Sequence, residues 1–142
     1  MAGMDGMAEG VPRPVPDGDT RPYWEGVARG ELLIQRCAAC DRYVFYPRSL
    51  CPHCGAAGPE WVAAAGDGTI YSYTVVHQAY GPFAEQVPYV VGLVELREGV
   101  RLLARIVGGP PDAMRIGAPV RVTFERVADD LTLPYFRLTE GE

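Results

Sequence analysis

Four cysteines constrain this chain more than any other feature. Cys37, Cys40, Cys51 and Cys54 are its only cysteines, and they form two C-x-x-C pairs with ten residues between the pairs. Two such turns on neighbouring hairpins bring four thiolates to one point, which is the closed donor set of a structural zinc site. Iron is the alternative metal, because thiolates accept both ions. With every coordination position filled by protein, the sequence predicts a metal that stabilises the fold and performs no catalysis.

Two other uses of the cysteines are weighed against a metal site: disulfides in a secreted domain, and a redox-active dithiol. Residues 1–19 are rich in Gly, Pro and Asp and contain no apolar stretch resembling a signal peptide. We therefore expect a disordered tail and a cytoplasmic protein. His53 lies inside the second C-x-x-C pair, but four better-spaced sulfurs already fill the tetrahedron. The predicted metal ligands are therefore the four cysteines.

The chain divides into four parts by composition: a tail (1–19), a helix (20–30), a metal ribbon (31–62) and a strand-rich domain (63–142). No apolar run approaches the roughly 20 residues that span a bilayer, so a membrane partner is not expected. The formal net charge is −5, and all 13 basic residues are arginine. An acidic chain of this kind is a poor candidate for binding a phosphate backbone.

The expected helix begins at Asp19 or Thr20, either of which can cap its first turn. Trp24, Val27 and Ala28 follow at helical spacing and form one apolar stripe. A helix of about ten residues needs a surface to pack on. Two surfaces remain open at this point: the protein's own ribbon, and a partner protein.

In the ribbon, short strands at 31–36 and 43–46 lead into and out of the first C-x-x-C pair. Gly55 follows the second pair, where a left-handed residue turns backbone N–H groups toward the sulfurs. Asp41 holds the matching position after the first pair and tolerates that conformation better than most residues. A zinc ion bound by four thiolates carries a net charge of −2. Three arginines beside the pairs are expected to offset that charge: Arg36, Arg42 and Arg48.

The second half of the chain reads as five strands in about 75 residues. Their expected ranges are Gly68 to Gln78, Pro88 to Arg97, Val100 to Val107, Ala118 to Val127 and Leu133 to Leu138. Glu98-Gly99 is a tight hairpin signal between the second and third strands. This pattern predicts a mainly β protein ending in a small five-stranded barrel of the OB type. A small β-sandwich is the alternative.

One strand is apolar on both faces. Between Tyr89 and Leu96, each of the two alternating sets of side chains is largely apolar, whereas a lone small barrel leaves one face wet. This strand therefore predicts cover from the ribbon, the helix or another chain. Together with the absence of a recognisable catalytic constellation, it favours a hetero-oligomer in which this chain is not the enzyme on its own. We expect the contact to use this strand and the helix around Trp24.

Several short runs resemble one protein family. In the first half they are YWEG (23–26), GELL (30–33), PR (47–48) and CPxCG (51–55); in the second they are GTIYS (68–72), PYVV (88–91), VEL (94–96) and IGxPV (116–120). Over about residues 20–138 they resemble the bacterial and archaeal family in which a rubredoxin-like zinc ribbon is fused to an OB-fold, long catalogued as a domain of unknown function. Asp41 stands where this family usually has Gly, and Tyr46 where it often has Pro.

The resemblance implies a non-catalytic accessory subunit of acyl-CoA enzymes. Members of that family associate with thiolase-superfamily subunits, namely thiolases, acyltransferases and lipid-transfer-type aldolases of steroid side-chain degradation, and others join hot-dog-fold hydratases. The OB-fold there helps to hold the coenzyme A thioester and steadies the partner's active site. The competing interpretation is a ribbon-plus-OB module that binds nucleic acid.

A coenzyme A ligand needs positive charge for its phosphates. Arg101 and Arg105 are four positions apart on one expected strand, so they share a side of it. Tyr80 begins a loop, residues 80–87, that lies beside them and is expected to cover the pantetheine arm. These three residues are the predicted coenzyme A contacts. The alternative is that both arginines simply solvate an outer barrel face.

Overall fold

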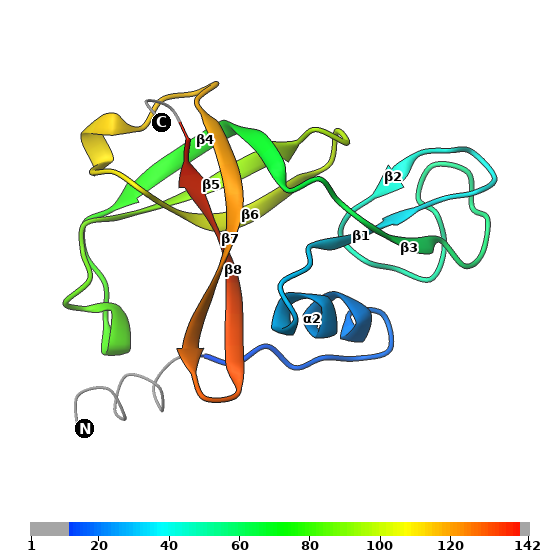
Figure 1. Ribbon diagram of the computed structural model, residues 1–142, viewed down its shortest axis with the longest axis horizontal. Helices are drawn as coiled ribbons and strands as arrows, with labels where there is room; N and C mark the ends of the chain where they lie inside the picture. The colour runs from blue at the N-terminus through cyan, green and yellow to red at the C-terminus, as the bar shows by residue number, and fades with distance from the viewer. Residues whose placement is uncertain (1–11, 140–142) are drawn as a thin grey trace.

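The computed structural model describes residues 12–139, which form one helix, a small three-stranded sheet and a five-stranded barrel (Figure 1). The disordered tail expected for residues 1–19 lies outside the described residues up to residue 11. Among residues 12–139, no helix has both the length and the apolar character that crossing a bilayer requires. The expected mainly β architecture, with a short N-terminal helix, a ribbon and an OB-fold barrel, is confirmed.

Helix α2 (Arg21–Ala28) lies between the ribbon and the barrel. Its buried side consists of Tyr23, Gly26 and Val27, whereas Ala28 is exposed. The buried stripe is therefore shifted by one residue from the expected one. Tyr23 and Val27 face inward, and Trp24 is half-buried beside them. The helix packs against β1 of the ribbon and β8 of the barrel. The helix therefore packs on the protein's own ribbon and barrel, and docking of its outer side on a partner stays a prediction.

The start of α2 is organised by Asp17 instead of by the expected cap residues. The Asp17 carboxylate accepts hydrogen bonds from the backbone N–H groups of Asp19 and Thr20, each at 2.9 Å. Thr20 occupies the N-cap position but makes no side-chain capping bond. Its hydroxyl instead bonds to Asp17. These hydrogen bonds lower the pKa of Asp17, since they favour the carboxylate form.

The ribbon sheet has the order β2-β1-β3. Strand β1 (Leu33–Arg36) is central and pairs antiparallel with β2 (Tyr43–Val44) and β3 (Glu60–Ala63). Strand β3 was missed by the sequence analysis, because four residues without a clear alternation give little signal. Its pairing with β1 completes the ribbon sheet, and the chain then continues into the barrel.

The barrel contains five strands, with the order β4-β5-β6-β8-β7 and closure between β4 and β7. Their bounds are β4 (Asp67–Val76), β5 (Tyr89–Leu96), β6 (Arg101–Val107), β7 (Pro119–Ala128) and β8 (Leu131–Leu138). The pairing of β6 with β8 is parallel, whereas all other pairs are antiparallel. Short 3-10 turns at Gly81–Phe83 and Pro111–Ala113 interrupt the two long connections.

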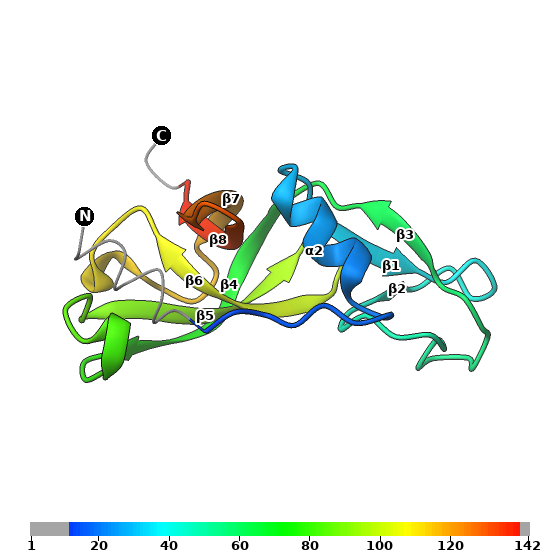
Figure 2. The same ribbon diagram turned by 90° about the horizontal axis from the view of Figure 1, so that it is seen from below.

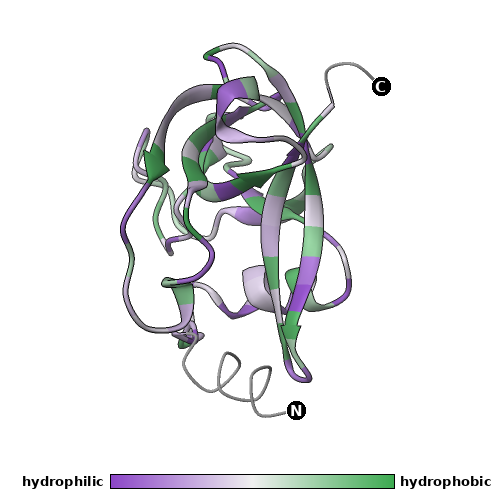
Figure 3. Ribbon diagram, turned by 90° about the vertical axis from the view of Figure 1, so that its left-hand side faces the viewer, coloured by the Kyte–Doolittle hydropathy of each residue, from purple (hydrophilic) through white to green (hydrophobic). Residues whose placement is uncertain are grey.

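The far end of the β7–β8 hairpin extends beyond the other barrel strands (Figure 1), and β8 contacts α2. Hydrophilic and hydrophobic residues alternate along both of its strands, as Figure 3 shows. Phe136 of β8 has no exposed surface and lies in the barrel interior with Val94 and Val120. Near the tip, Arg13 from the N-terminal segment forms an ion pair with Asp130 at 2.9 Å. The hairpin therefore connects the barrel core to the N-terminal part of the chain.

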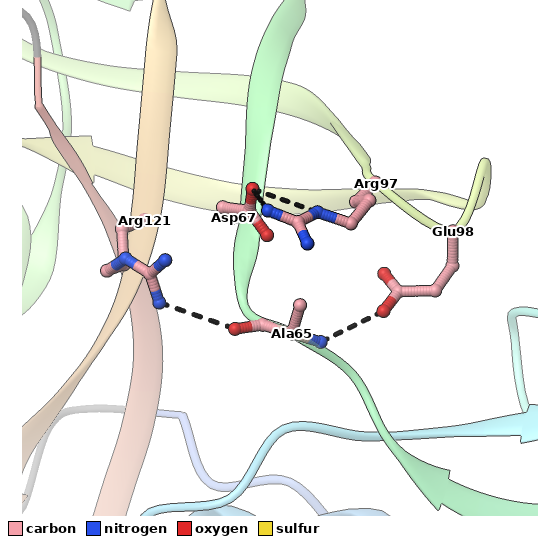
Figure 4. A network of polar contacts seen from close by, with 5 residues as sticks. All are labelled: Ala65, Asp67, Arg97, Glu98 and Arg121. Carbon is pink, nitrogen blue, oxygen red and sulfur yellow. Dashed lines mark hydrogen bonds and ion pairs between the residues drawn. The ribbon is translucent and has the colours of Figure 1, made fainter.

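The ribbon and the barrel are joined by residues 64–66 and a set of polar contacts (Figure 4; the two lobes are seen from below in Figure 2). The N–H of Ala65 donates to a carboxylate oxygen of Glu98 at 2.9 Å, and the Ala65 carbonyl accepts from Arg121 at 3.3 Å. Beside it, the guanidinium of Arg97 donates to Asp67 at 2.7 Å. Both backbone groups of Ala65 are thereby held by side chains of the barrel domain.

Candidate metal centre and barrel surface

The four cysteines converge on one point. Their sulfur atoms all lie within 4.8 Å of one another. The Cys37 and Cys54 sulfurs are 3.6 Å apart, and the Cys40 and Cys51 sulfurs are 3.7 Å apart. All four are free thiols, so the disulfide alternative is wrong for this structure. A tetrahedral site with Zn–S bonds of about 2.3 Å requires sulfurs about 3.8 Å apart, and these residues fit that requirement.

The two C-x-x-C turns share one backbone pattern. Asp41 and Gly55 have φ angles of 68° and 81°, which confirms the left-handed conformation expected at both positions. Their N–H groups donate to the carbonyls of Cys37 and Cys51, at 2.7 and 2.9 Å. In each turn this bond closes the loop around the sulfur pair. Asp41 therefore performs the same backbone role as Gly55, at the cost of a conformation that side chains disfavour.

Backbone donors also act on the sulfurs directly. The N–H of His53 donates to the Cys51 sulfur at 3.3 Å. Although burial of Cys51 opposes ionisation, hydrogen bonds from the backbone of His53 and Cys54 lower the pKa of the Cys51 thiol to about 7. The pKa of Cys40 in the same cluster is raised to about 11, so metal binding there has to displace protons from the sulfurs. The ring of His53 is not part of the cluster and contacts Arg42 at 3.3 Å instead.

The three arginines beside the cysteines have different surroundings. Arg36 is ion-paired with Asp41 on the first turn. Arg48 belongs to a clamp with the buried Gln35, whose amide accepts from the Arg48 N–H at 2.9 Å and donates to its carbonyl at 3.0 Å. The expectation that they offset the charge of a metal–thiolate centre stays a prediction.

On the barrel, Arg101 and Arg105 share the outer side of β6, since Leu102, Ala104 and Ile106 between and beside them are buried. The Arg101 guanidinium lies 3.8 Å from the ring centre of Tyr71 and bonds to Glu95 at 3.0 Å. Arg101 is thus fixed over Tyr71.

Arg105 follows the same pattern at the other end of the strand. Its guanidinium lies 4.2 Å from the ring centre of Tyr89 and donates to the Gln86 amide oxygen. Stacking of this type holds a cation in place while leaving its remaining donors available.

The two arginines line different clefts. Arg101 borders a cleft of about 620 Å³ between the ribbon and the β5–β6 turn. Arg105 borders a smaller cleft of about 190 Å³ beside Gly108 and Gly109. Tyr80 is 78% exposed and belongs to neither. The geometry therefore brings Arg101 and Arg105 onto one face but does not gather the three predicted coenzyme A contacts into one cleft.

The larger cleft contains residues that the sequence analysis did not assign to a ligand. Its ribbon wall includes Tyr43, Phe45, Arg42, Arg48 and His53. The signal that could have found it is the concentration of basic and aromatic residues around the cysteine pairs. What the sequence could not supply is the position of the β5–β6 turn opposite them.

Comparisons with known proteins agree with this architecture. Residues 24–60 match the family model described as "ChsH2, rubredoxin-like zinc ribbon domain", and residues 61–125 match "ChsH2, C-terminal OB-fold domain". A "Probable enoyl-CoA hydratase alpha subunit" of Thermomonospora curvata is 45% identical over 89% of this chain, which spans 39% of that longer protein. A "DUF35 domain-containing scaffold protein" of Methanocaldococcus jannaschii is 38% identical over 75% of this chain and 77% of its own length.

A solved structure described as "Ltp2-ChsH2(DUF35) aldolase" contains a chain that is 44% identical to this one. The match covers 89% of this chain and 98% of the other, with a TM-score of 0.82. The similarity therefore extends through the ribbon and the barrel together, in the same relative arrangement.

Proposed function

The chain belongs to the DUF35 family of ChsH2-type proteins, which join a rubredoxin-like zinc ribbon to an OB-fold domain, and from this membership we propose that it is a non-catalytic partner subunit of an enzyme acting on acyl-CoA thioesters. The catalytic subunit is a member of the thiolase superfamily, such as a thiolase, an acyltransferase or a steroid side-chain aldolase. The observation that carries this proposal is the 44% identity to the ChsH2(DUF35) chain of an aldolase structure, over nearly the whole of that chain.

The metal centre supports a structural role. Four thiolates complete a tetrahedron, which leaves no coordination position for a substrate or a reactive water. Zinc bound there would stabilise the two turns that carry the ligands, and the turns form one wall of the larger cleft. A rigid ribbon of this kind is suited to hold a surface in place for another protein.

We further propose that the barrel contributes to holding the coenzyme A thioester through Arg101, Arg105 and Tyr80. The outer face of the second and third strands is the surface that OB-folds generally use for ligands, and both arginines lie on it. Because they line separate clefts, they would contact separate parts of one extended ligand, whose remaining contacts belong to the catalytic subunit. Replacing Arg101 by alanine in the assembled complex should raise the KM for the acyl-CoA thioester. An unchanged KM would contradict this assignment while leaving the subunit role intact.

A nucleic-acid module is the second candidate, because tyrosines and arginines on an OB-fold face are suited to stacking bases. The net charge of −5 opposes it. A gel shift with single-stranded DNA, run beside the complex, distinguishes the two functions. We place the function in the cytoplasm, where thiols are kept reduced.

The direct experiment is purification of the tagged chain from its native host, with identification of bound proteins by mass spectrometry. We expect a thiolase-superfamily subunit in a fixed ratio to the chain. Purification of the chain without any such subunit, at micromolar concentration, would contradict the proposal.

A further inference from the structure

The outer face of strands β4 to β6 has an unusual composition for a solvated barrel surface. On β5, Val91 and Leu93 are half-buried on the outward side, while Val90, Gly92 and Val94 fill the interior. Leu103 of β6, directly opposite Leu93 in the pairing register, is 69% exposed. This apolar centre of Val91, Leu93 and Leu103, with its two flanking Arg–Tyr pairs, is called the β4–β6 outer face below.

The register places the flanking pairs at opposite ends of the apolar centre. Glu95 pairs with Arg101 in the ladder, and Val91 pairs with Arg105. Tyr71 and Tyr89 lie under the two guanidinium groups. An apolar centre bordered by tyrosine and arginine is the composition that distinguishes the energetically important part of protein interfaces.

The protein's own helix does not cover this face. Helix α2 packs on β1 and β8, so the apolar second side of β5 is not its docking surface. Helix α2 and strand β5 were expected to contact a partner together. Trp24 of α2 packs edge-on against Tyr23 within the chain, with 5.0 Å between the ring centres, whereas the outward side of β5 remains open. The cover predicted for this strand has to come from outside residues 12–139.

The charges of the face indicate the chemistry of the occupant. Arg101 is neutralised by Glu95 at 3.0 Å. Arg105 bonds to the neutral amide of Gln86 and, within residues 12–139, forms no ion pair. The face thus presents an apolar centre with one uncompensated cation at its edge. A matching surface is apolar and carries a carboxylate opposite Arg105.

We propose that the β4–β6 outer face is the surface on which the catalytic subunit docks, with a carboxylate of that subunit paired to Arg105. This inference rests on the proposed partner-subunit function and assigns its interface. It takes Arg105 as an interface residue, which leaves Arg101 and Tyr80 as the proposed coenzyme A contacts. A second copy of this chain fits the face less well. In a two-fold contact the same patch meets itself, and the patch offers no free carboxylate for Arg105, because Glu95 is already paired with Arg101.

The test uses Leu103→Asp and a matched control, Ile116→Asp. Ile116 is 68% exposed, nearly the same as Leu103, but lies in the connection between β6 and β7. The probe is the catalytic subunit that co-purifies with the wild-type chain, and affinity is measured with purified proteins. We expect Leu103→Asp to weaken binding at least tenfold and Ile116→Asp to leave it within twofold. Arg105→Glu should weaken binding severalfold, with a smaller dependence on salt than the wild type shows.

The metal content and melting temperature of each variant show whether it is folded. If Leu103→Asp does not fold, the affinity of Arg105→Glu decides the test. Equal affinity of wild type and Leu103→Asp would overturn the surface assignment while the partner-subunit function stands. Equal weakening by Leu103→Asp and Ile116→Asp would overturn it as well. So would a wild-type dimer that Leu103→Asp converts to a monomer, since a second copy would then be the occupant. A wild-type chain that binds no catalytic subunit would overturn the function and the surface together.

Discussion

The two ends of this molecule are stabilised by different means. In the ribbon turns, the buried apolar cluster consists of Cys37, Val44 and Cys51, two of which are metal ligands. In the barrel, the cluster is built from large aliphatic and aromatic side chains such as Ile70, Val94 and Phe136, all with 1% exposure or less. A segment of about 20 residues cannot bury enough apolar surface to hold itself together, so the metal takes the place of a core.

The part of the chain that the apolar core stabilises is larger than the barrel, because it includes one side of the ribbon. Leu32 and Ile34 belong to the ribbon, yet they are part of the large apolar cluster, as are Tyr23 and Val27 of the helix. One side of the ribbon is therefore held by the barrel's core and the other by its cysteines. Metal loss should therefore loosen the turns without separating the two lobes.

Metal removal should produce the largest effect. Structural zinc sites bind with apparent free energies of about 10–16 kcal/mol, and a substantial part of that stabilises the turns. We expect about one zinc per chain by elemental analysis. Cys51→Ser should abolish amide hydrogen-exchange protection around the turns, while protection of the barrel strands persists.

His53→Ala is the control, since its ring is outside the sulfur cluster, and it should retain full metal content. Low metal content in a wild-type chain whose turns are fully protected would show that the metal is not what holds them.

Truncation of the barrel core is the second test. Phe136 has 0% exposure, and Phe136→Ala should lower the free energy of unfolding by about 3–5 kcal/mol. The metal site should be unaffected in the folded fraction, because it does not share that cluster. Denaturant unfolding and zinc content measured on the same samples check both statements. Coupled loss of zinc and barrel structure would contradict the division of the molecule into two regimes.

Close backbone approach at the start of β4 offers a smaller perturbation. A Cβ atom at Gly68 would overlap the carbonyl oxygen of Glu95 on the neighbouring strand. Gly68→Ala should therefore force the strands apart and cost about 1–3 kcal/mol. Gly18→Ala is the matched control, since nothing lies within 4 Å of the position of its Cβ. Equal melting temperatures of the two variants would show that the β4–β5 spacing is not tightly held.

The smallest expected effect concerns the junction. Hydrogen bonding from Arg97 lowers the pKa of Asp67 from its ordinary value of 3.8. The carboxylate form is thus favoured in the folded state, so its stabilising contribution is present above about pH 4. It is lost as the pH falls through the lowered value. Arg97→Gln should raise the Asp67 pKa toward the ordinary value in an NMR titration of the carboxyl carbon. An unchanged pKa would mean that Arg97 does not act on Asp67 in solution.

Much of the fold was predictable because the relevant signals are local. The cysteine spacing predicted the two turns, including the left-handed Asp41, and Glu98-Gly99 predicted the β5–β6 turn. Strand β3 was not predictable, because its pairing with β1 is set by the closed ribbon and not by a pattern within Glu60–Ala63. The helix stripe was misplaced for a similar reason: Trp24 is the larger residue, but Tyr23 is the one that is buried, against Phe45 of the ribbon.

The candidate site was predictable in part. Strand alternation correctly placed Arg101 and Arg105 on one side of β6. It could not show that they border different clefts, since that depends on where the ribbon and the β6–β7 connection fold back. Their role toward coenzyme A stays a prediction. The doubly apolar pattern of Tyr89 to Leu96 is the sequence feature that led most directly to a structural surface.

The partner-subunit function is tested most directly by measuring turnover of an acyl-CoA substrate by the purified catalytic subunit while this chain is added. The chain by itself should show no turnover. Its addition should raise kcat/KM of the catalytic subunit until a fixed ratio of the two proteins is reached. Turnover by the chain alone, or a catalytic rate that does not respond to the chain at any ratio, would contradict the account.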